Sequence, residues 1–367
     1  MPRLSHSSKS SNHKNACIAA MGLALVLVSA GDSFAEGHFD TQHDHAVATE
    51  FGTLFSSFGA GAMVLELPEV VFGQTGWAPA TTGTLFAAQP DIATPIYSGT
   101  LGYILPEARI PSPFGRQLRV EISGVGWSEN ERSEQTTQPA IIMTVVSVDN
   151  SRQLLFGSGT RSAQIESRFS GIDATLRMVS DYELGTGVKL SPSLGVVGGK
   201  KWQKHMFDIS APFAAGTLEI PIDVVESLDT LEVGAELGAE ISAKVTDWLR
   251  LRAELRGALI HSDTHLAAND CLGNPIAVGG ACDGAFYATS VEADRQVANY
   301  RVVGSLGATV SLGLGDLSFS GFGGWESAMA GIRNPTAENR VPTSIKYDES
   351  KRYGGFVSLS IPLRHTH

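Results

Sequence analysis

The sequence predicts an all-β protein: a closed, antiparallel, up-and-down transmembrane β-barrel preceded by a cleaved signal peptide. We expect 10 strands, within a range of roughly 8–12. Three observations carry this prediction. Long segments alternate apolar and polar residues with a period of two. These segments run for about ten residues or more, whereas soluble strands average nearer five or six. The connections between them alternate between short and long, as in barrels that cross a membrane.

The N-terminus carries the features of a secretory signal peptide. Arg3, Lys9 and Lys14 precede an apolar run from Ala16 to Ala30, and small residues follow at Ser33 and Ala35. This run is too short to cross a bilayer comfortably as a helix. We therefore expect residues 1–35 to be removed by cleavage after Ala35.

Residues 36–50 are expected to form a flexible periplasmic segment before a barrel domain at 51–367. His38, His43 and His45 in this segment could bind zinc or copper, but a mobile polar tail is the favoured interpretation, as it is for His365 and His367. No metal site and no cofactor is predicted.

The clearest alternation runs from Leu231 to Val245 and again from Leu249 to Ile260. In both segments the odd positions are apolar or glycine, and all the charges lie at even positions. If the apolar rows face lipid, the charged rows line the lumen. The expected lumen network comprises Arg119, Glu121, Asp173, Arg177, Glu232, Glu236, Glu240, Arg250, Arg252, Glu254, Arg256 and Arg301. Lys189 and Glu326 are expected on the same inward rows. In a narrow barrel these groups would pair as a structural filling, which we favour, and in a wider one they would line an aqueous path.

These charges also predict a register for the hairpin 231–260. Pairing Glu240 with Arg252 and Glu236 with Arg256 avoids placing Glu240 opposite Glu254. Like charges directly across a strand pair cost up to about 1 kcal/mol each. We therefore expect paired residue numbers to sum to 492.

Ten segments are expected to form the barrel wall: Phe51–Leu67, Tyr97–Leu105, 115–127, 165–179, 187–199, 230–244, 248–260, 298–313, 316–327 and 351–363. Short turns are expected near Ser180–Thr186, Thr246 and Gly315, and long extracellular loops near 128–163, 200–228, 262–297 and 329–350. Asp149-Asn150 marks a hairpin turn within the first of these loops, which we interpret as protruding from the barrel. If that hairpin lies in the membrane instead, the count becomes twelve.

On these features, the chain resembles small Gram-negative outer-membrane β-barrel proteins, with the major-outer-membrane-protein-like and autotransporter barrels closest in style. Residues Arg352 to Leu359 match the barrel-assembly signal of that superfamily through Arg352, Gly354, Val357 and Leu359, although the usual terminal aromatic residue is missing. The resemblance implies location in the outer membrane of a Gram-negative bacterium. It also implies contact with outer-membrane lipid and with the barrel-assembly machinery.

Two local groups of residues could carry chemistry. His261, Ser262 and Asp263, followed by His265, could act on lipid or peptide, but they are sequence neighbours with no oxyanion donor, and a polar loop start is the favoured interpretation. Cys271 and Cys282 are expected to form one local disulfide in an oxidising compartment.

The net charge of −11 is the opposite of what a nucleic-acid binder carries. We expect a non-enzymatic barrel that displays its loops for adhesion, contact with an unknown extracellular partner, or envelope integrity. The alternative is a narrow porin-like channel for small polar solutes, and a lipid-acting barrel enzyme is less favoured.

Overall fold

The computed structural model describes residues 52–75, 83–88, 91–106, 117–137, 143–156, 161–213, 218–272, 287–336 and 341–363. All of them belong to one compact unit, His45–His367. The predicted signal peptide with Ala35, the segment 36–50 with its histidines, and His365 and His367 lie outside the described residues. No helix in the described part of the chain is long and apolar enough to cross a membrane.

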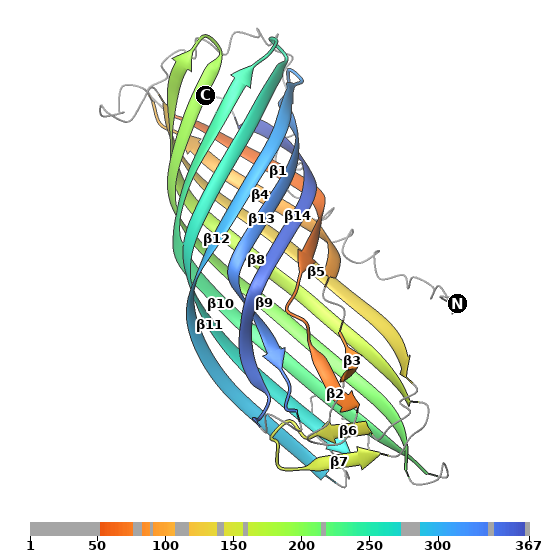
Figure 1. Cartoon of the computed structure of the whole chain (residues 1–367). Coiled ribbons are helices and arrows are strands. Elements are labelled where there is room, and N and C mark those ends of the chain that lie inside the picture. Colours follow the sequence, from red (N-terminus) through yellow and green to blue (C-terminus); the bar gives the residue numbers. More distant parts are fainter. Residues whose placement is uncertain are drawn as a thin grey trace. The chain divides into compact units, whose positions relative to one another are not determined.

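Ten antiparallel strands of the described chain close into a barrel (Figure 1). Its first and last strands pair along their lengths, for example at Leu54 with Leu363 and at Leu65 with Arg352. The strands are β1 (Thr53–Glu66), β4 (Asp91–Ile104), β5 (Gln117–Thr137), β8 (Arg161–Gly185), β9 (Val188–Phe213), β10 (Leu218–Lys244), β11 (Leu249–Leu272), β12 (Tyr287–Ser311), β13 (Asp316–Arg333) and β14 (Ser344–Leu363). The predicted ten-strand closed barrel is confirmed.

The two faces of each strand divide as the alternation predicts. Leu251 and Leu255 are 48% and 61% exposed on the outside, whereas Glu232 on the neighbouring strand is 4% exposed. Tyr300 and Tyr353 are exposed near one limit of the outer apolar surface, and Trp325 packs edge-on against Tyr300 at 5.1 Å. This arrangement is the aromatic girdle of a membrane barrel.

The expected short turns lie together at one end of the barrel. Gly187 and Gly313 take positive φ angles of 79° and 77°, which suit glycine in tight turns. Thr246 closes the β10–β11 turn by accepting a hydrogen bond from the Leu249 N–H at 3.0 Å. These three connections confirm the predicted short-turn end.

The expected long loops are instead largely strand. β9 and β10 continue to Phe213 and back from Leu218, and β11 and β12 continue to Leu272 and back from Tyr287. Strand also covers much of 128–163 and 329–350. The prediction failed there because the outward residues become polar beyond the membrane level, so the period-two apolar rows that mark a lipid-facing strand stop while the hydrogen-bonded ladder continues.

A second, four-stranded sheet lies at the end of the barrel where these long strands project (Figure 1). Its strands are β2 (Val71–Thr75), β3 (Gly83–Ala87), β6 (Met143–Val146) and β7 (Gln153–Phe156), in the order β3-β2-β6-β7. β6 and β7 form the hairpin expected around Asp149-Asn150, and they are not part of the ten-stranded ring. The sheet formed by β2 and β3 between β1 and β4 was not predicted.

Barrel closure leaves no room for a side chain at Gly354 in the predicted assembly signal. A Cβ atom there would lie 2.2 Å from the Ala62 carbonyl oxygen of β1 and 2.8 Å from the Phe322 ring. Val357 and Leu359, by contrast, point outward and are exposed. The motif therefore combines a close backbone approach with a lipid-facing apolar row.

We expect Gly354→Val to prevent correct closure, because the clash is with backbone of the partner strand. The folded yield is measured by the heat-dependent mobility shift on gels. Gly323→Val is the matched control, since an added Cβ at this neighbouring outward position meets nothing within 4 Å. Equal folded yields for the two variants would contradict the explanation.

Candidate functional site: the sealed lumen

The lumen near the short-turn end contains a first layer of ion pairs. Arg119 binds Glu121 through Nε at 2.6 Å and Asp181 through Nη1 at 2.9 Å. Arg177 binds Glu121 through Nε at 2.7 Å and reaches Glu254 on β11 at 3.0 Å. Because Arg177 lies on β8, this last contact spans the interior rather than following the wall.

A second, more deeply buried layer lies farther along the lumen. Lys201 binds Glu232 at 2.6 Å and Glu326 at 3.0 Å, and Arg301 binds the same two carboxylates at 2.5 and 3.1 Å. Arg301 also binds Asp173 at 3.2 Å. The guanidinium of Arg352 lies 3.5 Å from Glu326 and 3.6 Å from Asp173. Three cations thus balance three carboxylates, each side chain being 15% exposed or less.

Above these layers neutral hydrogen-bonding side chains join the inward rows before these rows become apolar. Asn299 donates hydrogen bonds to Ser262 Oγ at 3.0 Å and to the Ala328 carbonyl oxygen at 3.1 Å. Gln203 donates to the Ala330 carbonyl oxygen at 2.9 Å. The Asn299 bonds join the neighbouring strands β11, β12 and β13, and the Gln203 bond crosses the lumen from β9 to β13.

Two titratable groups at this level face each other on β9 and β10. Glu226 is the cross-strand partner of His205 and lies five residues beyond Leu231, the last strongly exposed apolar residue of β10. Burial raises the pKa of Glu226 to about 8, and the neighbouring Asp270 carboxylate adds to this shift. Burial also lowers the pKa of His205 to about 4. The imidazole Nδ1 lies 3.0 Å from Ser167 Oγ, so His205 is held as a neutral hydrogen-bonding group.

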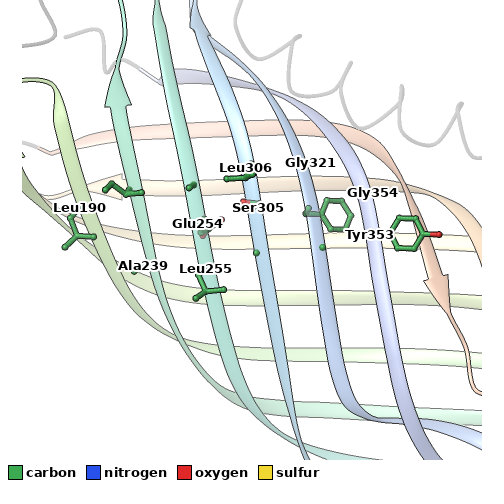
Figure 2. A pocket seen from close by; sticks show the side chains of 14 residues that line it. Leu190, Ala239, Glu254, Leu255, Ser305, Leu306, Gly321, Tyr353 and Gly354 are labelled. Carbon is green, nitrogen blue, oxygen red and sulfur yellow. The ribbon is translucent and has the colours of Figure 1, made fainter.

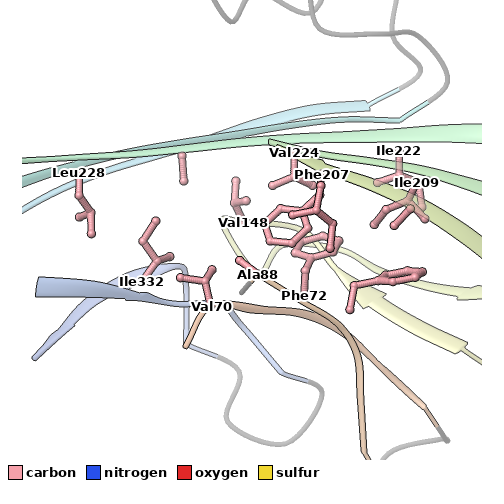
Figure 3. Close-up of a cluster of buried hydrophobic side chains, with 14 of the residues drawn as sticks. Val70, Phe72, Ala88, Val148, Phe207, Ile209, Ile222, Val224, Leu228 and Ile332 are labelled. Carbon is pink, nitrogen blue, oxygen red and sulfur yellow. The ribbon is translucent and has the colours of Figure 1, made fainter. Parts of the chain in front are cut away.

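The four-stranded sheet fills the projecting end of the barrel with apolar side chains. Phe72 stacks on Phe207 of β9 with ring centroids 5.5 Å apart. Figure 3 shows 14 residues of the buried cluster to which they belong. The whole cluster comprises Val70, Phe72, Phe86, Ala88, Val145, Val148, Ala163, Ile165, Phe207, Ile209, Ile222, Val224, Leu228, Leu266, Ala268, Ala330, Ile332 and Ile345. We call the four-stranded sheet with these inward side chains the apolar plug.

Hydrogen bonds to the barrel wall fix the position of the plug. Asn334 donates to the Val71 carbonyl oxygen at 3.1 Å, and the Val148 N–H donates to Asp270 at 2.9 Å. The Gln135 amide both donates to and accepts from the backbone of Ala87. The plug is therefore docked specifically as well as by apolar contact.

The structure brings most of the predicted lumen residues together. Arg119, Glu121 and Arg177 meet in the first layer with Glu254, Glu236 and Arg256, and Asp173, Glu232 and Arg301 meet in the second. Glu240 and Arg252 lie on the same inward rows. Arg250, opposite Lys244 beside the turn, is exposed instead.

Sequence reasoning missed three members of these layers. Lys201 fell in a range expected to be loop, Asp181 in a range expected to be turn, and Arg352 was assigned only to the assembly signal. The parity of Asp181 and Lys201 within β8 and β9 would have placed both inward if the strands had been extended by a few residues.

The predicted register of the β10–β11 hairpin is wrong. The observed pairs sum to 494, with Glu240 opposite Glu254 and Lys244 opposite Arg250. Glu254 obtains its cations from Arg177 across the lumen and from Arg256 on its own strand at 3.3 Å, so the direct pairing of two carboxylates is compensated. The prediction weighed only cross-strand neighbours.

The residues considered for catalysis do not form a site. His261 and Asp263 point outward, whereas Ser262 between them is buried in the lumen. Successive residues of a strand face opposite sides, so this Ser and His cannot cooperate. His265 forms an exposed pair with Asp294 at 2.8 Å.

Cys271 is buried and disulfide-bonded. Because Cys282 lies outside the described residues, the pairing of these two cysteines stays a prediction.

The outer wall carries a shallow apolar depression of about 1060 Å³ across β9–β14 (Figure 2). Leu255 and Leu306 stand beside Ala239, Gly304 and Gly323, whose small size creates the hollow. It lies on the apolar outer rows, which suits contact with acyl chains.

A closed sheet with an apolar exterior and a charged interior satisfies every backbone group within lipid. The described chain thus forms a closed ten-stranded β-barrel whose two faces are those of a membrane-spanning barrel.

The chain matches no protein-family model and no curated protein. Among solved structures, the barrel is similar to the outer membrane protease OmpT from Escherichia coli, with a TM-score of 0.45 and 10% identity over 88% of this chain and 100% of that one. It is also similar to the CymD monoaromatic hydrocarbon channel, with a TM-score of 0.31 and 11% identity over 87% and 90% of the two chains. The toluene transporter TodX from Pseudomonas putida is also similar, with a TM-score of 0.27 and 9% identity over 84% of this chain and 89% of that one. These likenesses concern the barrel fold, and the narrower resemblance to major-outer-membrane-protein or autotransporter barrels stays a prediction.

Proposed function

We propose that this barrel is a non-conducting, non-catalytic membrane anchor that presents a rigid projecting surface outside the cell. The observation that carries the proposal is the double closure of the lumen by balanced ion layers and by the apolar plug. Lys201, Glu232 and Glu326 have side chains that are 5% exposed or less, as in a packed protein interior. A barrel of ten strands is about narrow enough for side chains to fill it.

The projecting part is built from strands rather than from the loops expected from sequence. β10 and β11 contain 27 and 24 residues, whereas about 9–11 suffice to cross a bilayer. At about 3.3 Å per residue and a tilt of roughly 40°, the residues beyond the apolar rows project roughly 30 Å. Their outward positions include Asp229, Asp263 and Glu292, which suit a solvated surface. An internally packed, polar-surfaced extension is suited to contact with a partner, which we take to be extracellular.

Planar-bilayer recording of the refolded, processed protein tests this proposal. We expect no steady stepwise conductance, because both closures would have to open. A Phe72→Ser, Phe207→Ser variant, which weakens only the plug, should also stay closed since the ion layers persist. Folding of both proteins is verified by the heat-dependent mobility shift.

Steady conductance of the wild-type protein would instead establish the narrow channel. Conductance of the plug variant alone would show that the ion layers pass solutes and that the plug is a gate. Either result would overturn the proposed function.

A further inference from the structure

A group of cations gathers on the outer surface of β5, β8 and β9, in a chain that is acidic overall. Arg168 and Lys204 are direct cross-strand partners. Lys200, Trp202 and Lys204 are three successive outward positions of β9. Arg132 on β5 is opposite Glu166. We call Arg132, Arg168, Lys200, Lys204 and Trp202 the interfacial basic cluster.

The cluster lies at the upper limit of the lipid-facing surface. Lys200 shares a row with the outward residues Ile172 and Leu231, which are 51% and 59% exposed. Its ammonium turns over the Trp202 ring, 4.9 Å from the centroid, as expected for a lysine that extends from the acyl region toward the headgroups. Arg168 and Lys204 lie four residues farther along their strands than Ile172 and Lys200, about 13 Å by strand rise and about 10 Å along the barrel axis at a tilt of roughly 40°. The cations are therefore at headgroup level.

The geometry of the arginines leaves donors directed outward. Glu166 accepts hydrogen bonds from Arg168 at 2.6 Å and from Arg132 at 2.7 Å, which fixes both guanidinium groups beside each other. Their side chains remain 53% and 71% exposed. Asp229 on β10 lies opposite Trp202 and adds a second outward carboxylate. Four cations, Arg132, Arg168, Lys200 and Lys204, still outnumber Glu166 and Asp229, so the group keeps excess positive charge. Placing Arg168 directly opposite Lys204 is unfavourable by a few tenths to about 1 kcal/mol unless an anion joins them.

We propose that the interfacial basic cluster binds the phosphate groups of a phosphorylated glycolipid headgroup in the outer leaflet. Phosphate accepts the paired N–H groups of arginine and the point charge of lysine, and Trp202 supplies the aromatic contact typical of the membrane boundary. The site requires the projecting end of the barrel to face outside, as the proposed function does. It does not require the lumen to be closed, so the two proposals fail independently.

Binding of bis-phosphorylated lipid A to the refolded protein in zwitterionic detergent micelles tests the site. We expect the Arg168→Gln, Lys204→Gln variant to bind about 30-fold more weakly, because each cation near an anionic surface contributes roughly a factor of five. The matched control is Arg333→Gln, Lys351→Gln, which removes the same charge from exposed positions on β13 and β14 and should bind as wild type does. Folding of each variant is confirmed by the heat-dependent mobility shift.

Two further arms identify the ligand chemistry. Lipid A without its phosphates should bind about as weakly as the cluster variant does, and millimolar inorganic phosphate should fail to compete with micromolar lipid A. Equal weakening in the two variants, undiminished binding of the dephosphorylated lipid, or full competition by inorganic phosphate would each overturn the proposal.

Discussion

Arg301→Ala is expected to destabilise the barrel by about 3–5 kcal/mol, because it leaves buried carboxylates without their cation. Arg301 contacts Glu232, Glu326 and Asp173 at 2.5 to 3.2 Å, and its side chain is 7% exposed. Urea titration of the refolded protein in detergent micelles, followed by tryptophan fluorescence, measures the loss. Lys351→Ala is the control: this lysine is 66% exposed and its nearest carboxylate is 3.9 Å away, so less than about 0.5 kcal/mol should be lost.

A double variant separates charge balance from packing. Arg301→Met with Glu326→Met removes one cation and one carboxylate from the second layer and keeps apolar volume in their place. It should recover much of the lost stability, since a buried pair replaced by apolar residues is often neutral. If Arg301→Ala alone costs no more than Lys351→Ala, the second layer does not seal the lumen as we infer.

Glu226→Gln is expected to stabilise the barrel above pH 7 and to flatten its pH dependence. The pKa of Glu226 is raised by burial from 4.5 to about 8, so between these values the folded state holds a proton that the unfolded state has lost. Stability therefore falls with rising pH across this window, by up to about 1.4 kcal/mol per pH unit. The glutamine variant lacks this slope.

His205 contributes a pH dependence of folding stability opposite in sign to that of Glu226. Its pKa is lowered from 6.5 to about 4, so stability falls as pH drops through this range, because the unfolded state gains the proton first. The two slopes offset each other between about pH 4.5 and 6.5, and the wild-type protein should be most stable there. Urea midpoints at pH 5, 7 and 9 check both groups. A wild-type midpoint that is unchanged from pH 5 to 9 would contradict the burial of Glu226 in the folded state.

The barrel wall was predictable because lipid and lumen impose opposite demands on successive residues. Leu251 and Leu255 against Arg252 and Glu254 leave only one orientation for β11. The strand number and the short turns follow from the same pattern. The ion-pair partners could not be predicted from this pattern. Arg177 contacts Glu254 across the lumen, and the spacing of residues along the sequence does not show which side chains meet there.

The plug was missed for a related reason. Its strands are short, and Val70, Phe72 and Phe86 alternate over too few residues to stand out from an ordinary connection. Their partners, such as Phe207 and Leu228, lay in ranges that resembled polar loops once the outward rows lost their apolar residues. An apolar row that moves to the opposite parity is the signal that could have located them.

That change of parity fixes the position of the barrel along the membrane normal. Along β10 the greasy positions are Leu237, Val233 and Leu231 on the outside, and then Leu228 and Val224 on the inside. Sinking by a single row would drag Asp229 among hydrocarbon tails, and rising by one would strip Leu231 of them. The same strand therefore has a solvent-facing outer surface in its first part and a lipid-facing outer surface in its second. The change between Leu231 and Leu228 marks the membrane boundary along β10.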